Sequence, residues 1–309
     1  MDKLFLRGAD LTTISNEYTR LSNITEYKRN TRLGNIIVDY FTLHERLHTK
    51  CKVGISFIEF WRDFDFYSQK PYVKKMLDYY EREGKYRGQP ERIALSIFRL
   101  YFGSIQIFRP IVAMEIYSRF PDHKHVLDPT MGWGGRLVGG ALRALDSYTG
   151  IDSNRNLQKP YADMTAFLLE RSTIKINTHF CDAVHFDYST VFYNMVFTSP
   201  PYETKEIYRD MSIPNNWYFD FYEPLFRNTW EYLQPGGVYI LQIPESIYER
   251  YAIPVLGQSH EVLPFVKYSR NNKYRESFYI WFKQSNNIVY EHSDIEMQIL
   301  PPTYSQNEN

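Results

Sequence analysis

The tetrapeptide Ser199-Pro200-Pro201-Tyr202 follows directly on the apolar run MVFT and has residue types that could do chemistry. Proline fixes φ, has no backbone donor and keeps the residue before it extended. A hydroxyl, a carbonyl and an aromatic ring are therefore held in a stiff geometry just beyond a strand-like run. A bare Pro-Pro pair is also typical of an ordinary strand-ending turn, so the rest of the chain must decide between these interpretations.

Acidic residues and glycines follow three further strand-like runs. Asp128 precedes Pro-Thr-Met-Gly-Trp-Gly-Gly (129–135), and Asp152-Ser153 and Asp182-Ala183 end the next two runs. Glycines let a backbone approach a ligand without interference from a Cβ atom. Asp128 could accept a hydrogen bond from an amino group. Asp152 stands 24 residues later, where an acidic residue accepts from ribose hydroxyls.

These motifs belong to a region in which strand-like and helix-like runs alternate. Strand-like runs end at Asp128, Asp152, Asp182 and Ser199 and continue at 237–244, 261–269 and 276–283, with helix-like runs at 135–145, 159–172 and 218–233. This alternation predicts an α/β fold with a parallel sheet and helices on both faces, and the closely spaced last two strands predict an antiparallel addition. Ligands of such sheets bind at the carboxyl ends of the strands, so the motifs should share one rim.

The preceding part of the chain has no clean alternation. Apolar residues recur at helical spacing in 70–85, 89–103 and 109–120, and the last two runs begin near a proline, which favours a first helical turn. We therefore expect a mostly helical region over 1–105, a sheet domain over 106–285 and a C-terminal tail over 286–309.

The glycine loop allows three nucleotide interpretations. A phosphate-binding loop needs Lys-Ser/Thr after its glycines, but Arg136-Leu137 stands there, and GWGGRL does not have the GxGxxG spacing of a dinucleotide loop. A carboxylate before the glycines is also a poor neighbour for a pyrophosphate. An acid-led loop suits a nucleoside without phosphates whose other end has an amino group, and S-adenosylmethionine fits that description.

The glycine loop together with Ser-Pro-Pro-Tyr resembles the class I S-adenosylmethionine-dependent methyltransferases that modify exocyclic amino groups of nucleobases. The resemblance covers roughly residues 105–285, and Phe108-Arg109-Pro110 is similar to the family segment that contacts the methionine end of the cofactor. It implies a Rossmann-like, seven-stranded sheet whose last strand is antiparallel. The cofactor-binding residues expected on this basis are Phe108, Arg109, Pro110, Asp128, Thr130, Met131, Gly132, Gly134, Asp152, Ser153, Asp182 and Ala183.

The resemblance also gives the corner a catalytic role. An exocyclic amine is conjugated with its ring and is a poor nucleophile, so it needs acceptors for its hydrogens. Ser199 Oγ and the Pro200 carbonyl can accept them, Pro200 and Pro201 hold the geometry, and Tyr202 can stack on the base. Serine at the first position is commoner in members that methylate cytosine N4, so that target is favoured over adenine N6.

The charge distribution suggests a nucleic-acid partner. Net charge is zero, but residues 1–105 have 18 Lys and Arg against 13 Asp and Glu, a net of +5, which leaves −5 on the remainder. DNA is favoured over RNA. Two alternatives remain: an RNA base methyltransferase, and a catalytically silent subunit that binds nucleic acid. The chain could also form an oligomer or join a partner subunit. The span from Asp128 to Lys283 has no room for a separate target-recognition domain, so we expect recognition to fall to the loop 203–217 or to the basic N-terminal region.

Metal and membrane sites are not expected. Cys51 and Cys181 are far apart, His44 and His48 have no further ligand nearby in sequence, and no run of 18 apolar residues occurs. A protein with these features should be soluble and cytoplasmic, in a bacterial, phage or viral setting.

Overall fold

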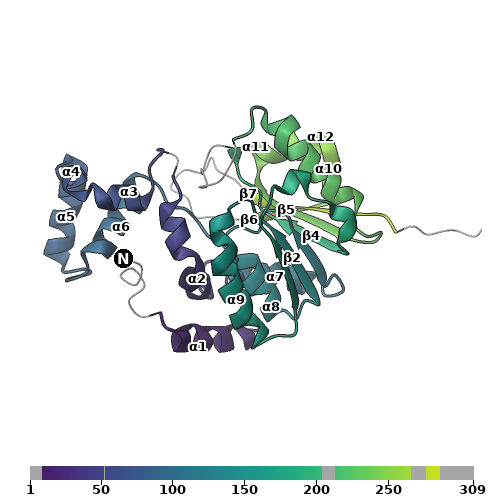
Figure 1. Ribbon diagram of the computed structural model, residues 1–309, viewed down its shortest axis with the longest axis horizontal. Coiled ribbons are helices and arrows are strands. Elements are labelled where there is room, and N and C mark those ends of the chain that lie inside the picture. The colour runs from purple at the N-terminus through teal and green to yellow at the C-terminus, as the bar shows by residue number, and fades with distance from the viewer. Residues whose placement is uncertain (1–8, 52, 204–212, 266–275, 286–309) are drawn as a thin grey trace, which may run out of the picture.

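The computed structural model describes residues 9–51, 53–203, 213–265 and 276–285 (Figure 1). Within these ranges, seven helices precede the first strand: α1 Leu11–Ser22, α2 Asn35–His48, α3 Phe57–Arg62, α4 Phe64–Ser68, α5 Pro71–Glu83, α6 Pro90–Tyr101 and α7 Pro110–Arg119. Strands and helices then alternate: β1 His125–Asp128, α8 Gly135–Leu142, β2 Ser147–Ile151, α9 Gln158–Leu169, β3 Lys175–His179, β4 Met195–Thr198, α10 Glu223–Glu231, β5 Val238–Pro244, α11 Glu245–Ile247, α12 Ile253–Leu256, β6 Glu261–Phe265 and β7 Glu276–Phe282.

The seven strands form one sheet in the order β3-β2-β1-β4-β5-β7-β6. The first five strands are parallel, whereas β7 runs antiparallel to both β5 and β6. The chain reverses its direction of travel between β3 and β4, and the β1/β4 neighbours form the switch point at which open sheets bind ligands. The predicted seven-stranded α/β sheet with an antiparallel last strand is confirmed.

Helices cover both faces of the sheet (Figure 1), and apolar residues fill the space between the helices and the sheet. One buried cluster joins the sheet to α7, α8 and α9, and the other joins it to α10, α11 and α12. The central strands β4 and β5 are buried along their whole length, as parallel strands with two covered faces should be.

The N-terminal helices divide between two cores. Ile14 and Leu21 of α1 and Ile37 of α2 belong to the cluster under the sheet, together with α7 and α8. A third cluster is built from α3 to α6 and also takes Leu43 and Leu47 from the C-terminal half of α2. The N-terminal core that is separate from the sheet is therefore built mainly from α3–α6 and does not take in all of residues 1–105. Helix α2 contributes side chains to both cores.

Local sequence signals explain where these helices begin and end. Proline occupies the first turn of α5, α6 and α7, and Ser56 and Glu59 form a capping box at α3. Gly84 ends α5 in the left-handed region, at φ +62°. The expected helix 218–233 differs in its first turn, since Tyr218–Tyr222 is a π-helical turn that leads into α10.

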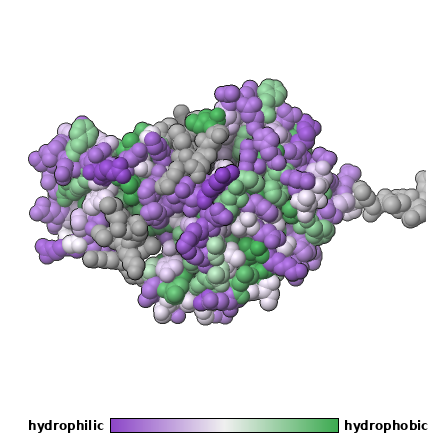
Figure 2. Space-filling model, viewed as in Figure 1, coloured by the Kyte–Doolittle hydropathy of each residue, from purple (hydrophilic) through white to green (hydrophobic). Residues whose placement is uncertain are grey.

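The face of the molecule in Figure 2 is mostly hydrophilic with scattered apolar side chains. In the described ranges, no helix combines the length and apolar character that crossing a bilayer requires. Most of the loop 203–217, the second half of the run 261–269 and the tail 286–309 lie outside the described residues.

Candidate active site

A cavity of about 850 Å3 opens at the carboxyl ends of the parallel strands. Small-molecule pockets span roughly 300–1,000 Å3, so this one is large for a single nucleoside. The predicted residues that line it are Phe108, Arg109, Thr130, Met131, Gly132, Asp152, Ser153, Asp182, Ala183, Ser199, Pro200, Pro201 and Tyr202. The fold brings the strand-end motifs into one cavity, and the role of each residue stays a prediction.

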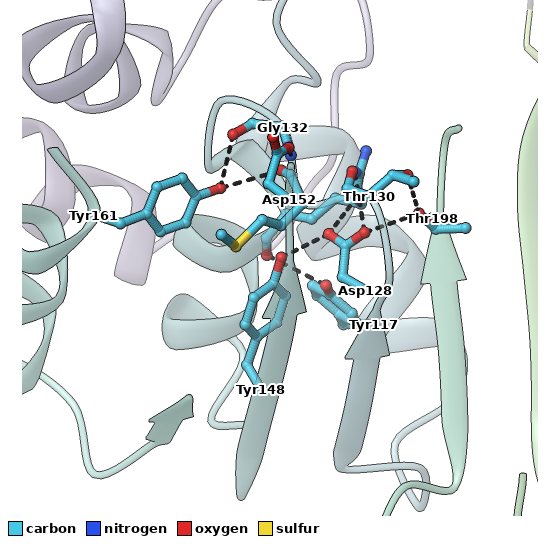
Figure 3. A network of polar contacts seen from close by, with 10 residues as sticks. Tyr117, Asp128, Thr130, Gly132, Tyr148, Asp152, Tyr161 and Thr198 are labelled. Atoms are coloured by element: carbon cyan, nitrogen blue, oxygen red, sulfur yellow. Dashed lines mark hydrogen bonds and ion pairs between the residues drawn. The ribbon is translucent and has the colours of Figure 1, made fainter. Parts of the chain in front are cut away.

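The glycine loop lines one wall of the cavity and is held there by polar contacts, some of which Figure 3 shows. Gly132 has φ +56°, which favours glycine, and a Cβ atom at Gly135 would lie 1.8 Å from the carbonyl oxygen of Phe108. The Tyr161 hydroxyl, from α9, lies 3.1 and 3.0 Å from the carbonyl oxygens of Met131 and Gly132, which share its single hydrogen. Close packing at Gly135 therefore seats the Phe108 segment directly against the loop.

Asp128 does not have the role that the sequence predicted. Its side chain is fully buried and is not among the residues that line the cavity. The carboxylate accepts from Arg136 Nε at 2.6 Å, from the Tyr148 hydroxyl at 2.6 Å and from the Thr198 hydroxyl at 2.9 Å (Figure 3). These internal donors occupy its oxygens, so the expected contact with a cofactor amino group is corrected: Asp128 joins β1, β2, β4 and α8 beneath the site.

Arg136 is a site residue that sequence reasoning missed. Its guanidinium is almost fully buried, pairs with Asp128, and donates from Nη2 to the Thr130 carbonyl at 2.5 Å. Burial alone would lower its pKa, but Asp128 outweighs that effect and raises it. The same group lies 5.0 Å from the centre of the Phe108 ring and faces the cavity. A buried aspartate at a strand end needs a cation nearby. The arginine that directly follows the glycines in the sequence could have identified that cation.

Two other predicted cofactor-binding residues lie beside the cavity lining and not in it. Gly134 and Pro110 are not among the residues that line the cavity. Gly134, at φ +94°, is the residue before α8, and Pro110 starts α7 while packing against Gly34. Both shape the backbone that carries cavity residues.

Asp152 lies at the end of β2 with its carboxylate toward the glycine loop. It accepts from the backbone nitrogens of Gly132 and Asn154, both at 2.9 Å. Burial raises the pKa of this carboxyl to about 6, and the two backbone hydrogen bonds oppose that rise. A partly buried carboxylate that is ionised at neutral pH and lines the cavity can accept from ligand hydroxyls.

Asp182 begins the turn after β3. Its carboxylate accepts from the backbone nitrogen of Val184 at 2.9 Å and lies 3.0 Å from Nδ1 of the exposed His185. Ala183, the next residue, is buried against the second cluster and lines the cavity. This turn therefore presents a fixed carboxylate and a small side chain to the cavity. A flat ring could enter beside the small side chain.

The Ser199–Tyr202 corner is fixed by a chain of hydrogen bonds. The Tyr202 hydroxyl donates to the backbone carbonyl of Gln242 at 3.0 Å, and Ser199 Oγ lies 3.0 Å from the same hydroxyl. A phenol has one hydrogen, so Ser199 must be the donor in the second contact. Its lone pairs then remain available as acceptors in the cavity. The Tyr222 hydroxyl, which donates to the Pro201 carbonyl at 2.6 Å, holds the other side of the corner.

A buried polar pair beside this corner was also missed. Gln242 in β5 and Glu276 at the start of β7 line the cavity, and Gln242 Nε2 donates to Glu276 Oε2 at 2.8 Å. Both side chains are almost fully buried. Gln242 interrupts the apolar strand VYILQIP, and that break in an otherwise buried run was the signal.

Helix α2 supports the cofactor side of the cavity from behind. Thr42 Oγ1, which donates to the Val38 carbonyl at 2.8 Å, lies 3.2 Å from the Trp133 carbonyl, and the buried Glu45 accepts from Asn154 Nδ2 at 3.1 Å. Asn154 is the residue whose backbone nitrogen binds Asp152. The N-terminal region is thus part of the site, which the division at residue 105 did not anticipate.

The rings of His44 and His48 lie near the C-terminal end of α2, with their centroids 4.6 Å apart and their planes tilted by 52°. Across the described ranges, no group of three or more His, Cys, Asp or Glu side chains is placed to hold a metal ion.

Comparison with known proteins gives matches in structure alone. No protein-family model matches the chain, and no curated protein matches its sequence. Among solved structures, a methyltransferase from Pyrococcus furiosus is 18% identical over 64% of this chain and 98% of its own, with a TM-score of 0.39. The type I restriction-modification system methyltransferase subunit from Streptococcus thermophilus is 16% identical over 59% of this chain and 45% of its own, with a TM-score of 0.42.

An rRNA methylase from Streptococcus thermophilus is 14% identical over 59% of this chain and 100% of its own, with a TM-score of 0.38. Values this low are insufficient to transfer a substrate or a residue role from any of these proteins.

Proposed function

We propose that this chain transfers a methyl group from S-adenosylmethionine to an exocyclic amino group of a DNA base, with cytosine N4 as the first candidate and adenine N6 as the second. The observation that carries the proposal is the hydrogen-bond chain at the corner. It leaves Ser199 Oγ as an acceptor inside the same cavity that contains Asp152.

The cofactor half of the cavity has a donor and acceptor set that suits this group. Asp152 would accept from the ribose hydroxyls, and Asp182 and Ala183 would flank the adenine. With Asp128 enclosed, Arg109 is the charged side chain on this wall that would meet the methionine end. When bound, S-adenosylmethionine supplies an electrophilic methyl group.

The substrate half acts by positioning rather than by strong base catalysis. Ser199 Oγ and the Pro200 carbonyl would each accept a hydrogen bond from the amine. These two hydrogen bonds would turn the nitrogen lone pair toward the methyl group. The prolines and the Tyr202–Gln242 hydrogen bond set those acceptors before the substrate arrives, so no reorganisation is needed during reaction. The methylated amine then releases its proton to water.

The lining beyond the corner suits a base edge that donates hydrogen bonds. Tyr202 and Phe221 supply rings, and Gln242 and Glu276 supply amide and carboxylate oxygens. Carboxylates pair with the cytosine amino group, and glutamine pairs with adenine. These oxygens favour an amine-bearing base over one with carbonyl groups alone.

The test is transfer of a labelled methyl group to DNA and RNA of the same sequence, followed by nucleoside mass spectrometry. We expect N4-methylcytosine or N6-methyladenine in DNA. Ser199→Ala should reduce kcat by roughly tenfold or more, with unchanged cofactor affinity, because the acceptor matters most as the amine rehybridises.

Three results would contradict the proposal. Methylation of RNA alone would move the substrate class to RNA. Cofactor binding without transfer to any nucleic acid would indicate a silent subunit, and an undiminished rate in Ser199→Ala would reduce the corner to a strand-ending turn.

A further inference from the structure

The residue that directly follows the Ser199–Tyr202 corner has an unusual backbone conformation. Glu203 has φ +53°, in the left-handed region that favours glycine and that a residue with a long side chain rarely adopts. This conformation costs free energy, and it persists only where the surrounding groups hold it in place. The contacts of Glu203 therefore identify what fixes the end of the corner.

Two side chains of a single turn hold the Glu203 carboxylate. The Tyr251 hydroxyl donates to Glu203 Oε1 at 2.5 Å, and Arg250 Nη1 donates to the same oxygen at 2.8 Å. Both donors belong to Tyr248–Ala252, a π-helical turn between α11 and α12. The Arg250 side chain is 59% exposed, and an ion pair with so much solvent contact adds little stability. The contact therefore matters for the position of Glu203 rather than for the free energy of unfolding.

Tyr222 binds the backbone on the other side of Glu203. The Glu203 amide donates to the Tyr222 hydroxyl at 3.4 Å, and that hydroxyl donates to the Pro201 carbonyl at 2.6 Å. A phenol has one hydrogen, so its donation to Pro201 leaves the Tyr222 oxygen to accept from Glu203. One buried hydroxyl thus joins the two peptide groups that flank Tyr202.

The rings of Tyr222 and Tyr251 stack on each other. Their centroids are 4.4 Å apart and their planes are inclined by 15°, so the residue that holds the Glu203 carboxylate also packs on the residue that holds its amide. We call Glu203, Tyr222, Arg250 and Tyr251 the corner clamp. It joins the corner to two later turns of the chain, which pack against each other on the face of the sheet that α10, α11 and α12 cover (Figure 1).

The turn that carries Tyr222 also forms part of the cavity wall. Tyr218–Tyr222 is the π-helical turn that leads into α10, and its Asp220 and Phe221 line the cavity. Single π-helical turns are rare and often occur at functional sites. Because Phe221 and Tyr222 are neighbours in one turn, a displacement of Tyr222 from the corner would also displace the Phe221 ring. The clamp therefore fixes the corner relative to this wall.

We propose that the corner clamp positions the two hydrogen-bond acceptors of the corner for the substrate amine. Glu203, Arg250 and Tyr251 are not among the residues that line the cavity, and they act through Tyr222, so they are positioning residues and not catalytic ones. Acceptors that are held before the substrate arrives need no reorganisation during the reaction, and a small misplacement is costly in rate. The inference rests on the proposed function for the reaction at the corner, whereas the hold on the corner is measured without methyl transfer.

The test is hydrogen–deuterium exchange of the full chain, followed by mass spectrometry of the segment 195–203. Tyr251→Phe keeps the ring that stacks on Tyr222 and removes the hydroxyl that binds Glu203. We expect the amides of this segment to exchange roughly fivefold faster, as for the loss of one hydrogen bond. The same variant should lower kcat for methyl transfer by a similar factor. Its affinity for S-adenosylhomocysteine, measured by calorimetry, should be unchanged, which shows that it is folded.

Two substitutions of Glu203 separate the clamp from the backbone strain. Glu203→Asn shortens the side chain by one methylene group, so it loses the contact with Tyr251, while asparagine tolerates the left-handed conformation better than glutamate does. If the clamp positions the corner, this variant should still exchange faster and turn over more slowly than the wild type. Glu203→Gln keeps an oxygen that can accept from Tyr251 and should restore most of both values.

Tyr248→Phe is the matched control. Tyr248 belongs to the same π-helical turn as Tyr251. Its hydroxyl donates to Gln258 Oε1 at 2.9 Å and accepts from the backbone nitrogen of Ser259 at 3.0 Å, and neither of these residues belongs to the corner. This substitution removes a hydroxyl from the same turn without touching the clamp, so exchange over 195–203 and kcat should both keep their wild-type values.

The outcomes separate this inference from the proposed function. Wild-type exchange in Tyr251→Phe and Glu203→Asn would overturn the clamp, as would faster exchange with an unchanged kcat or an equal effect of Tyr248→Phe. Faster exchange in both clamp variants of a protein that methylates no nucleic acid would support the hold on the corner and contradict the proposed function. Methyl transfer by the wild type, with wild-type exchange in both clamp variants, would do the reverse.

Discussion

The Tyr202 hydroxyl has a single hydrogen, and its donation to Gln242 decides what Ser199 can do. Tyr202→Phe removes both the donor to Gln242 and the acceptor for Ser199. The Ser199 hydrogen is then free to turn toward the incoming amine, where it would compete for the lone pair. We expect kcat to fall by roughly fivefold, the equivalent of about 1 kcal/mol for one hydrogen bond, with cofactor affinity unchanged. Single-turnover kinetics would measure it, and a wild-type rate would show that Tyr202 does not orient Ser199.

Asp152 gives the site a predictable pH dependence. Its folded pKa, raised by burial to about 6, means that the carboxylate is ionised above pH 6 and protonated below it. Only the ionised form accepts from both ribose hydroxyls, so affinity for S-adenosylhomocysteine should be highest above pH 7. It should fall by up to tenfold per pH unit below about pH 6. Calorimetry between pH 5 and 8 is the measurement.

The control for this dependence is Asp152→Asn, which cannot ionise. It should bind more weakly at pH 7, by about 1.5–3 kcal/mol for lost hydrogen bonds to a charged group, and with a flat pH profile. A profile of the same shape in both proteins would assign the titration to another group.

Asp128 and Asp152 also show what sequence can tell about single residues. Both were predicted from their positions at strand ends, and both lie there. Asp128 is enclosed because Arg136, Tyr148 and Thr198 converge on it from α8, β2 and β4, whereas Asp152 faces the cavity. Side-chain direction at a strand end depends on which neighbours surround it, and one sequence does not contain that information.

At the scale of elements, α2 connects the helical region to the cofactor loop. Glu45 does not line the cavity, but it accepts from Asn154, whose backbone positions Asp152. Glu45→Ala would leave the buried Asn154 amide without this partner and loosen the loop. We expect S-adenosylhomocysteine to bind about 1–2 kcal/mol more weakly, as measured by calorimetry.

Glu45→Gln is the conservative variant because its side-chain oxygen can still accept from Asn154. It should restore most of the affinity. If both variants bind as the wild type does, α2 contributes packing and has no effect on Asp152.

The sequence predicted the type of an element where its periodicity was strong. It did not predict which other elements that element packs against. The runs 89–103 and 109–120 are α6 and α7, each with its proline in the first turn. Ile97 and Leu100 stand at helical spacing in the run 89–103, but Ile97 is fully buried whereas Leu100 is 60% exposed, and Phe98 is buried. Periodicity indicates that a helix has an apolar face, but the width of that face and the surface that covers it depend on tertiary contacts.

For the whole molecule, the shared helix α2 predicts how the chain unfolds. It gives Ile37 and Val38 to the cluster under the sheet and Leu43 and Leu47 to the α3–α6 cluster. Neither core can lose α2 without exposing apolar surface, and burial of each such side chain is worth about 1.5–3 kcal/mol. We therefore expect the two cores to unfold in a single calorimetric transition, although sequence composition divided the chain near residue 105.

A ligand that binds the sheet domain should then shift that entire transition. At S-adenosylhomocysteine concentrations near 100 times its Kd, linkage stabilises the folded state by about 2.7 kcal/mol, which raises the Tm by several degrees. If α3–α6 were an independent module, scanning calorimetry would instead resolve two transitions, and the ligand would move only one. Phe60→Ala, in the core of α3–α6, distinguishes these cases further. In a coupled molecule it lowers the Tm at which the cofactor site is lost, whereas in a modular one it leaves that temperature unchanged.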